Sequence, residues 1–453
     1  MVNYIYPIQN IDIFFSSKCD LNCSYCYVGK ESKRYNPYND NIKQSIINGS
    51  FAKNIISSFK EFKEDIISIG CWGGEPTLNN NVFYILFKDL LQYFHNTTYI
   101  LFSTNGYSGI KNLKPFIDNT IKLSDEVDRN ITLQIQFSLD GPDYITDNQR
   151  GLGVTAHVVN TFEDIIKYIS SIKHDNASFK FHLKPTLSMD IVKKLTCDEN
   201  LLYEYFQFFD NIWENNKNNV IGDNFEVDFK AMPTLVSPAQ QTQENGIIFS
   251  KFIHMISELD ENMFMNYKHP FFVQGFNNLR CILNKTQHFD FLNTLGSCAC
   301  GAGLGSYSTD IYGNIYPCHR YFSESVILHE DKRRTCEKYT TILDDDKNNK
   351  INKIKTINAM YENNSKSRKA FFDIIVMALA RYGQIEKDYL VNSEKRSVLF
   401  YIIGEFLCHY GRSEETKDLF IESTDYIKLF GNGALEELIK YGVKTGEIKY
   451  DDI

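Results

Sequence analysis

The sequence predicts an α/β fold: a partial (β/α)6 barrel of the TIM type, followed by a small cysteine-rich module and an all-helical C-terminal region. Two observations favour it: strand-like and helix-like runs alternate through the first half of the chain, and the unusual polar and glycine motifs follow the strands directly. The alternation stops after the sixth strand. The six predicted strands are Ile11–Phe15, Ile66–Trp72, Tyr99–Ser103, Ile131–Leu139, Phe179–Lys184 and Phe225–Ala231.

Helical stretches separate these strands, at about Asn41–Phe62, Asn81–Phe94, Ile110–Leu123, Val158–Ile172 and Leu201–Asn215. Such alternation favours parallel strands joined by right-handed crossovers. The carboxyl ends of parallel strands meet at one edge, and the loops of that edge form the active face of a barrel. A barrel of six units is expected to stay open at one side, which suits a large substrate.

The domain boundaries follow from changes in composition along the chain. We expect the partial barrel over residues 1–235, a helical bridge over 236–297, the cysteine-rich module over 298–345 and a helical region over 346–453. The segment from Cys298 to Tyr321 is rich in glycine and too short for a hydrophobic core of its own, which predicts stabilisation by metal.

Composition excludes several classes of function. The chain has 453 residues, more than one ordinary core accommodates, and a net charge of −9. This charge argues against a surface that coats nucleic acid or anionic membranes. The sequence has no apolar run of membrane-spanning length and no signal peptide, so we expect a cytoplasmic protein. Clustered cysteines in that compartment indicate metal or redox chemistry.

The first cysteine cluster follows the first predicted strand. Cys19, Cys23 and Cys26 have the spacing C-x3-C-x2-C. Three thiolates that hold a cubane iron–sulfur cluster leave one iron open to bind a small molecule. A structural zinc loop is the alternative, but zinc requires a fourth ligand, and no further His or Cys follows closely.

These cysteines, followed by Gly73-Gly74-Glu75-Pro76 after the second strand, resemble the pattern of radical S-adenosylmethionine enzymes. The later Cys300-Gly-Ala-Gly, Asp310 and Gly313-x4-Cys318 are similar to the start of the SPASM or twitch extension. The resemblance covers about residues 10–322. It implies a 4Fe–4S cluster whose open iron chelates S-adenosylmethionine, and whose electron cleaves it to methionine and a 5'-deoxyadenosyl radical that abstracts hydrogen.

The resemblance also assigns residues to the cofactor. Tyr25, the aromatic residue between the second and third cysteines, is similar to the family position that contacts adenine. The two glycines let the backbone approach the methionine amine. Ser138 and Arg150 match the spacing of residues that contact the ribose and the methionine carboxylate in sulfatase-maturating members. The predicted cofactor-binding residues are Tyr25, Gly73, Gly74, Glu75, Ser103, Asn105, Ser138 and Arg150.

The second cysteine cluster predicts one auxiliary 4Fe–4S cluster. Cys300 and Cys318 fit the first auxiliary site of the family, with Cys298 as a third ligand for which Cys281 competes. The fourth ligand is either Cys336 or absent. The later cysteines of the full SPASM pattern are missing, so we expect no second auxiliary cluster. A zinc knuckle is the alternative.

The string Tyr316-Pro317-Cys318-His319-Arg320 bears on the substrate. It resembles maturases that crosslink ribosomally made peptides, for example through a thioether. His319 is a candidate base or a hydrogen-bond partner of the cluster. Formylglycine formation in sulfatases is an alternative, which an aspartate at this position would favour. A non-catalytic iron–sulfur or zinc-binding protein is another alternative.

The expected partners are a precursor peptide or protein substrate and an electron donor such as flavodoxin or ferredoxin, with no nucleic acid and no membrane. The chain begins almost directly at the first strand, so we expect no leader-binding domain before the barrel. Cys71, Cys408 and Trp72 are predicted to be core residues, with a place in the lining of the cavity as the alternative for Trp72.

Overall fold

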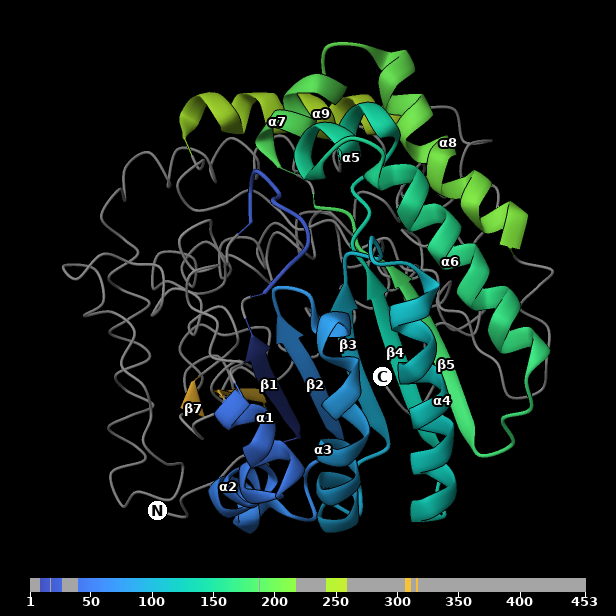
Figure 1. Cartoon of the computed structure of the whole chain (residues 1–453). Coiled ribbons are helices and arrows are strands. Elements are labelled where there is room, and N and C mark those ends of the chain that lie inside the picture. Colours follow the sequence, from blue (N-terminus) through green and yellow to red (C-terminus); the bar gives the residue numbers. More distant parts are fainter. Residues whose placement is uncertain are drawn as a thin grey trace, which may run out of the picture.

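The computed structural model describes residues 9–16, 18–26, 40–186, 188–216, 242–258, 306–310 and 315–316. These residues contain one sheet, whose strand order is β5-β4-β3-β2-β1-β6-β7 (Figure 1). The strands are β1 (Asn10–Ser16), β2 (Ser68–Gly73), β3 (Tyr99–Thr104), β4 (Ile131–Phe137), β5 (Ala177–Leu183), β6 (Ser306–Asp310) and β7 (Ile315–Tyr316).

The helices connect the strands in chain order. They are α1 (Asp40–Ile47), α2 (Ser50–Phe59), α3 (Asn80–Tyr93), α4 (Ile110–Val127), α5 (Asp143–Arg150), α6 (Val154–Ser171), α7 (Met189–Leu195), α8 (Glu199–Asn216) and α9 (Gln243–Glu258). Short 3-10 turns lie at Lys60–Phe62 and Pro76–Asn79. Within the described ranges, no helix is long and apolar enough to cross a membrane.

The strands from β1 to β6 pair in parallel, and only β7 runs antiparallel to its neighbour β6. The predicted α/β class with parallel strands is therefore confirmed. Five of the six predicted strands are present in the described residues, with shifted bounds. The expected sixth strand, Phe225–Ala231, lies outside these residues.

The strand that pairs with the free side of β1 comes from a distant part of the chain. Residues 306–310 form β6, with Ile13 opposite Thr309 and Phe14 opposite Asp310. This strand was not predicted from the sequence, because Ser-Tyr-Ser-Thr-Asp lacks the apolar residues that mark a buried strand. Here the neighbouring strand, rather than local hydrophobicity, determines the extended conformation.

Helices α3 and α4 lie side by side along one face of the sheet (Figure 1). Aromatic rings fill the space between them and the strands. The ring of Phe116 in α4 lies 4.5 Å from that of Phe83 in α3 and 4.7 Å from that of Phe102 in β3. All three side chains are almost fully buried, so this layer contributes much of the hydrophobic core.

The predicted helix Asn41–Phe62 is interrupted. Gly49 adopts a left-handed conformation with φ of 76° between α1 and α2, and this conformation ends the first helix. Helices α5 and α7 were not predicted. Both are short, with eight and seven residues, and polar side chains in α5 weaken its periodic signal.

The opposite face of the sheet carries polar side chains. Along β4, Leu133 and Ile135 belong to the apolar core, whereas the alternate residues Gln134 and Gln136 project to the other face. The Gln134 Nε2 lies 3.3 Å from the Nδ1 of His182 in β5. A parallel sheet covered by helices on both faces has apolar residues on both, so this face is built for polar contacts.

The carboxyl ends of β1 to β5 point toward one edge of the sheet, where residues 18–26 and helices α5 and α7 lie (Figure 1). Parallel pairing explains this arrangement, since every strand from β1 to β5 has the same direction. The motifs that follow the strands in the sequence therefore meet at this edge.

Candidate metal centre

The loop with the three cysteines, residues 18–26, begins just after an irregularity in β1. The register between β1 and β2 shifts between Phe14 and Ser16, which marks a bulge at the end of the strand. The carbonyl of Lys18 accepts a 2.8 Å hydrogen bond from the Glu75 N–H. The Ser24 N–H donates to the carbonyl of Gln149 in α5 at 2.8 Å. The loop backbone is thereby fixed at two points, by the segments that follow β2 and β4.

The sulfurs of the first two cysteines receive hydrogen bonds from the protein. The sulfur of Cys19 accepts from the Leu21 N–H at 3.4 Å and from the Asn105 Nδ2 at 3.6 Å. The sulfur of Cys23 lies 3.9 Å from its donor, the Arg150 Nη1. Such donors stabilise a thiolate. All three loop cysteines are free and half-buried.

Burial determines the protonation of two of these thiols, those of Cys19 and Cys23. It raises the pKa of Cys19 to about 12, although the Leu21 N–H lowers it. Burial also raises the pKa of Cys23, and the positive charge of Arg150 opposes this shift. The thiols of Cys19 and Cys23 are therefore protonated at neutral pH, and metal binding would release their protons.

Within residues 9–16 and 18–26 and the other described ranges, no group of three or more His, Cys, Asp or Glu side chains has the arrangement of a site for one metal ion. The ligands of an iron–sulfur cluster bind different irons, so they need not converge on one point. The donor set fits a cluster better than a single ion: three thiols on a short loop, two of them facing hydrogen-bond donors.

The carboxylate of Glu75 joins the ends of β2 and β3. Its Oε1 accepts hydrogen bonds from the N–H and the hydroxyl of Thr77 and from the hydroxyl of Thr104, at 3.1, 2.6 and 2.9 Å. Its Oε2 accepts from the Asn105 N–H at 2.6 Å. Burial raises the pKa of Glu75 to about 7, against the lowering effect of these hydrogen bonds. Both oxygens thus have protein partners, and a cofactor contact by Glu75 stays a prediction.

Asn105 extends this contact to the cysteine loop. Its side-chain Oδ1 accepts from the Tyr107 N–H at 2.8 Å, which fixes the orientation of the amide. The Nδ2 group donates to the Oδ1 of Asp20 at 2.6 Å and faces the sulfur of Cys19. The other oxygen of Asp20 accepts from the Ser108 hydroxyl. Asn105, predicted from the sequence as a cofactor residue, therefore contacts the loop itself.

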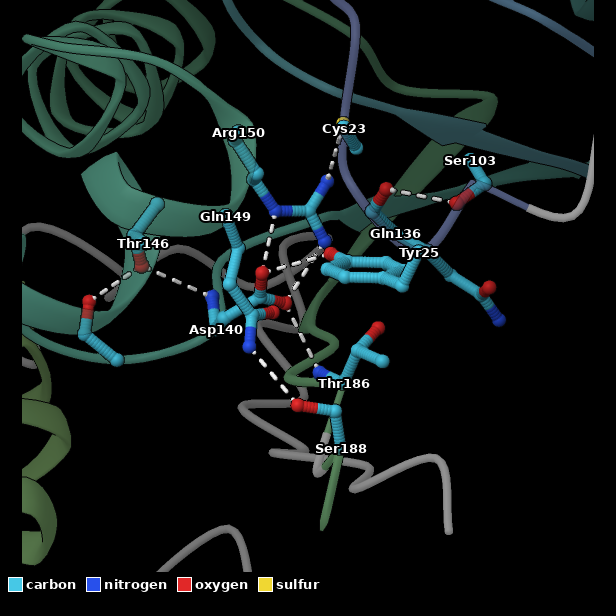
Figure 2. A network of polar contacts seen from close by, with 11 residues as sticks. Cys23, Tyr25, Ser103, Gln136, Asp140, Thr146, Gln149, Arg150, Thr186 and Ser188 are labelled. Carbon is cyan, nitrogen blue, oxygen red and sulfur yellow. Dashed lines mark hydrogen bonds and ion pairs between the residues drawn. The ribbon is translucent and has the colours of Figure 1, made fainter. Parts of the chain in front are cut away.

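A second buried carboxylate, Asp140, lies just after β4 (Figure 2). It accepts from the Nε and Nη2 of Arg150 at 2.8 and 2.7 Å, a bidentate ion pair. The hydroxyl of Tyr25 donates to its Oδ2 at 2.6 Å, and the Thr186 N–H donates to its Oδ1 at 3.0 Å. The guanidinium of Arg150 also lies 5.3 Å from the centre of the Tyr25 ring.

These contacts bear on the roles predicted for Arg150 and Tyr25. The fork of the guanidinium binds Asp140, and Nη1 points to Cys23, so a bidentate contact with a cofactor carboxylate would have to replace a protein partner. Burial lowers the pKa of Arg150, but its interactions with neighbouring groups, above all the negative charge of Asp140, together have the larger effect. The pKa is therefore raised above its usual value, and the guanidinium stays a cation. The cofactor contacts of both residues stay predictions.

The remaining predicted cofactor residues lie at or near the same edge. Gly73 ends β2, and Gly74 follows it. The hydroxyl of Ser103 donates to the carbonyl of Gln136 at 3.4 Å, and the N–H of Ser138 donates to the carbonyl of Thr104 at 2.8 Å. Both serine side chains are only partly buried, which leaves them accessible.

The predicted auxiliary site and the candidate base belong to a part of the chain that the structure does not describe. Cys281, Cys298, Cys300, Cys318, His319, Cys336 and Cys408 lie outside the described residues. Two predictions for the core can be checked. Cys71 is fully buried in β2, as expected. Trp72 is only partly buried, and the ammonium of Lys184 lies 5.7 Å from its ring centre.

A protein-family model described as a 4Fe-4S single cluster domain matches residues 11–147. The match begins in β1, contains the whole cysteine loop and ends within α5. It supports an iron–sulfur protein. No curated protein shows significant similarity to this chain.

Sequence reasoning missed the part of Asp140. This residue belongs to the Ser-Leu-Asp-Gly string that drew attention to Ser138, but it received no role of its own. One signal was available: an acidic residue directly after an apolar strand lies at the strand's carboxyl end, where Arg150 was already placed. Its contacts with Tyr25 and Thr186 have no counterpart in the local sequence.

Proposed function

We propose that the protein is a radical S-adenosylmethionine enzyme that modifies a peptide or protein side chain. The observation that carries the proposal is the match of an iron–sulfur cluster domain to a segment whose only clustered thiols are Cys19, Cys23 and Cys26. Three thiolates leave one iron of a 4Fe–4S cluster without a protein ligand. The glycines Gly73 and Gly74 at the end of β2 support a cofactor at that iron, since the lack of side chains lets a ligand approach the backbone.

The residues of this chain would hold and orient the cofactors. The three cysteines would bind the cluster, with Asn105 and Arg150 as donors to two of the sulfurs. When bound, the cluster and S-adenosylmethionine supply a hydrogen-abstracting carbon radical through one-electron cleavage of the sulfonium bond. The half-buried position of the loop would limit the access of water.

We further propose that the sheet belongs to a partial barrel with its lumen on the polar face. Two features support this: residues 18–26 lie at the carboxyl edge of the strands, and Gln134, Gln136 and His182 line the face opposite the core helices. A polar lumen below the cluster would suit a peptide, whose backbone requires hydrogen-bond partners.

The substrate class rests on the sequence of the second cysteine cluster. The Tyr-Pro-Cys-His-Arg string favours a maturase that crosslinks a precursor peptide, with one auxiliary 4Fe–4S cluster held by Cys300, Cys318 and further cysteines. His319 would act near that cluster as a base or as a hydrogen-bond donor. A flavodoxin or ferredoxin in the cytoplasm would supply the electron.

The first test of the proposal is the iron content of the protein. Protein reconstituted anaerobically should hold about eight irons if both clusters form. Reduced protein with S-adenosylmethionine should release 5'-deoxyadenosine, and Cys23→Ala should abolish this release. The matched control is Cys197→Ala, since Cys197 is an exposed cysteine beyond α7. Cofactor cleavage by Cys23→Ala, or a preparation that binds only zinc, would contradict the proposal.

A further inference from the structure

Asp140 is a buried carboxylate beside the cysteine loop, and all of its hydrogen-bonding capacity is used by the protein. Its side chain is fully buried, and its two oxygens accept four hydrogen bonds. The Oδ2 accepts from Tyr25 and from the Arg150 Nε, and the Oδ1 accepts from the Arg150 Nη2 and the Thr186 N–H. A carboxylate has about four lone-pair sites, so Asp140 has no free capacity for a substrate.

These four bonds join segments that are far apart in the sequence. Asp140 follows β4, Arg150 ends α5, Thr186 follows β5, and Tyr25 lies in the cysteine loop. The start of α5 is tied to the same point, because the Asp140 N–H donates to the hydroxyl of Thr146 at 3.2 Å. The position of Arg150 relative to the loop is therefore set by several elements at once.

The ion pair leaves one nitrogen of the guanidinium for another partner. Nε and Nη2 are held by Asp140 in two parallel bonds, which fix the plane of the group. Nη1 then points to the sulfur of Cys23, as Figure 2 shows. The Arg150 side chain is 6% exposed, so solvent screens its charge weakly.

We propose that Arg150 raises the reduction potential of a cluster bound by the cysteine loop, and that Asp140 is the positioning residue that directs Arg150 to the Cys23 sulfur. The inference rests on the proposed function only in requiring a cluster on the loop. Reduction adds negative charge to a cluster and its thiolates. A cationic donor beside one sulfur therefore favours the reduced form, as hydrogen bonds to cluster sulfurs do in general.

The decisive variant is the double substitution Asp140→Asn with Arg150→Gln. It removes both charges of a buried pair, so no uncompensated charge remains and the net charge of the site is unchanged. In the reconstituted full-length protein, redox titration monitored by EPR gives the ratio of reduced to oxidised cluster at a fixed ambient potential. We expect this ratio to fall on the order of tenfold, the size of effect that loss of a hydrogen bond to a charged group has on other equilibria of proteins. An unchanged ratio would overturn the inference.

The single variant Asp140→Asn tests the positioning role of Asp140. It also replaces the double variant as the test if the double variant does not fold. If Asp140 directs Arg150, the ratio should fall toward that of the double variant, because the freed guanidinium leaves Cys23. If Arg150 kept its place without Asp140, its uncompensated charge would favour the reduced cluster further. A ratio equal to or above that of the wild type would therefore refute the positioning role.

Arg129→Gln is the matched control. Arg129 precedes β4, at the opposite edge of the sheet, and donates to the backbone carbonyls of Thr97, Leu91 and Phe94. Its loss should leave the ratio unchanged, and a shift as large as that of the double variant would contradict a local effect of Arg150. Iron content separates the two proposals. If the wild-type protein takes up no cluster, both proposals are refuted. If the wild type binds a cluster and the variants keep its ratio of reduced to oxidised cluster, only the inference about Arg150 and Asp140 is refuted.

Discussion

The Asn105 N–H donates a 2.6 Å hydrogen bond to the carboxylate of Glu75, and this bond joins the carboxyl ends of β2 and β3. The same asparagine directs its side chain to Asp20 and to the sulfur of Cys19. In a similar way, Asp140 binds the guanidinium of Arg150, which faces the sulfur of Cys23. Two buried carboxylates thus orient the donors that face two of the three loop cysteines.

The pKa of Glu75, raised by burial to about 7 from 4.5, predicts a pH dependence of stability. Between these two values the folded chain keeps a proton that the unfolded chain has released. Raising the pH through this window should therefore lower the free energy of unfolding, by up to about 1.4 kcal/mol per pH unit. Urea unfolding of iron-free protein at several pH values measures the slope.

Glu75→Gln should remove this contribution to the slope and leave one N–H or hydroxyl without its acceptor, at a cost of about 1–3 kcal/mol. Glu126→Gln is the control, because the side chain of Glu126 is partly exposed and the hydrogen bond from Tyr84 lowers its pKa. The control should keep the wild-type slope above pH 4.5. A Glu75→Gln slope equal to that of the wild type would refute the assignment to Glu75.

Tyr25→Phe should destabilise the protein by about 1.5–3 kcal/mol, since it removes a hydrogen bond to a charged acceptor, the Asp140 carboxylate. Tyr144→Phe is a matched comparison, because the Tyr144 hydroxyl donates to the neutral carbonyl of Leu201 at 3.2 Å. It should cost less, about 0.5–1 kcal/mol. Chemical denaturation measures both. If both variants lost the same free energy of unfolding, the charge of Asp140 would add nothing to the strength of its hydrogen bond with Tyr25.

Gly141→Ala should destabilise the protein by several kcal/mol, roughly 2–4, from steric overlap and backbone strain together. Gly141 has φ of +146°, and an added Cβ would lie 2.7 Å from the buried ring of Tyr205 in α8. Gly109→Ala separates the cost of backbone strain from the cost of steric overlap. Gly109 also has a positive φ, +76°, but an added Cβ would meet nothing within 4 Å.

Gly109 has ψ of 178°, so its variant should lose only the backbone strain of this conformation, about 1–3 kcal/mol. Thermal and urea unfolding of both variants provide the comparison. If Gly141→Ala were as stable as Gly109→Ala, the ring of Tyr205 would have room to move, and the close packing of α8 on the Asp140 turn would be disproved.

Much of the fold was predictable, because local patterns determine its parts. Alternating apolar residues mark strands such as β4, and helical periodicity marks α3 and α6. The break at Gly49 was missed, since an isolated glycine in an apolar, periodic stretch is compatible with a continuous helix. The position of β6 was missed because its polar sequence becomes a strand only through pairing with β1.

The sequence by itself determined the spacing of Cys19, Cys23 and Cys26 and the order of strands and helices, and with them the iron–sulfur character that the family match supports. Only the tertiary structure decided which groups face the sulfurs and which carboxylates orient them. Tyr25 and Asp140 are 115 positions apart and meet because parallel strands bring their carboxyl ends to one edge. Spacing is a local property of the chain, whereas hydrogen-bond partners depend on how distant elements pack.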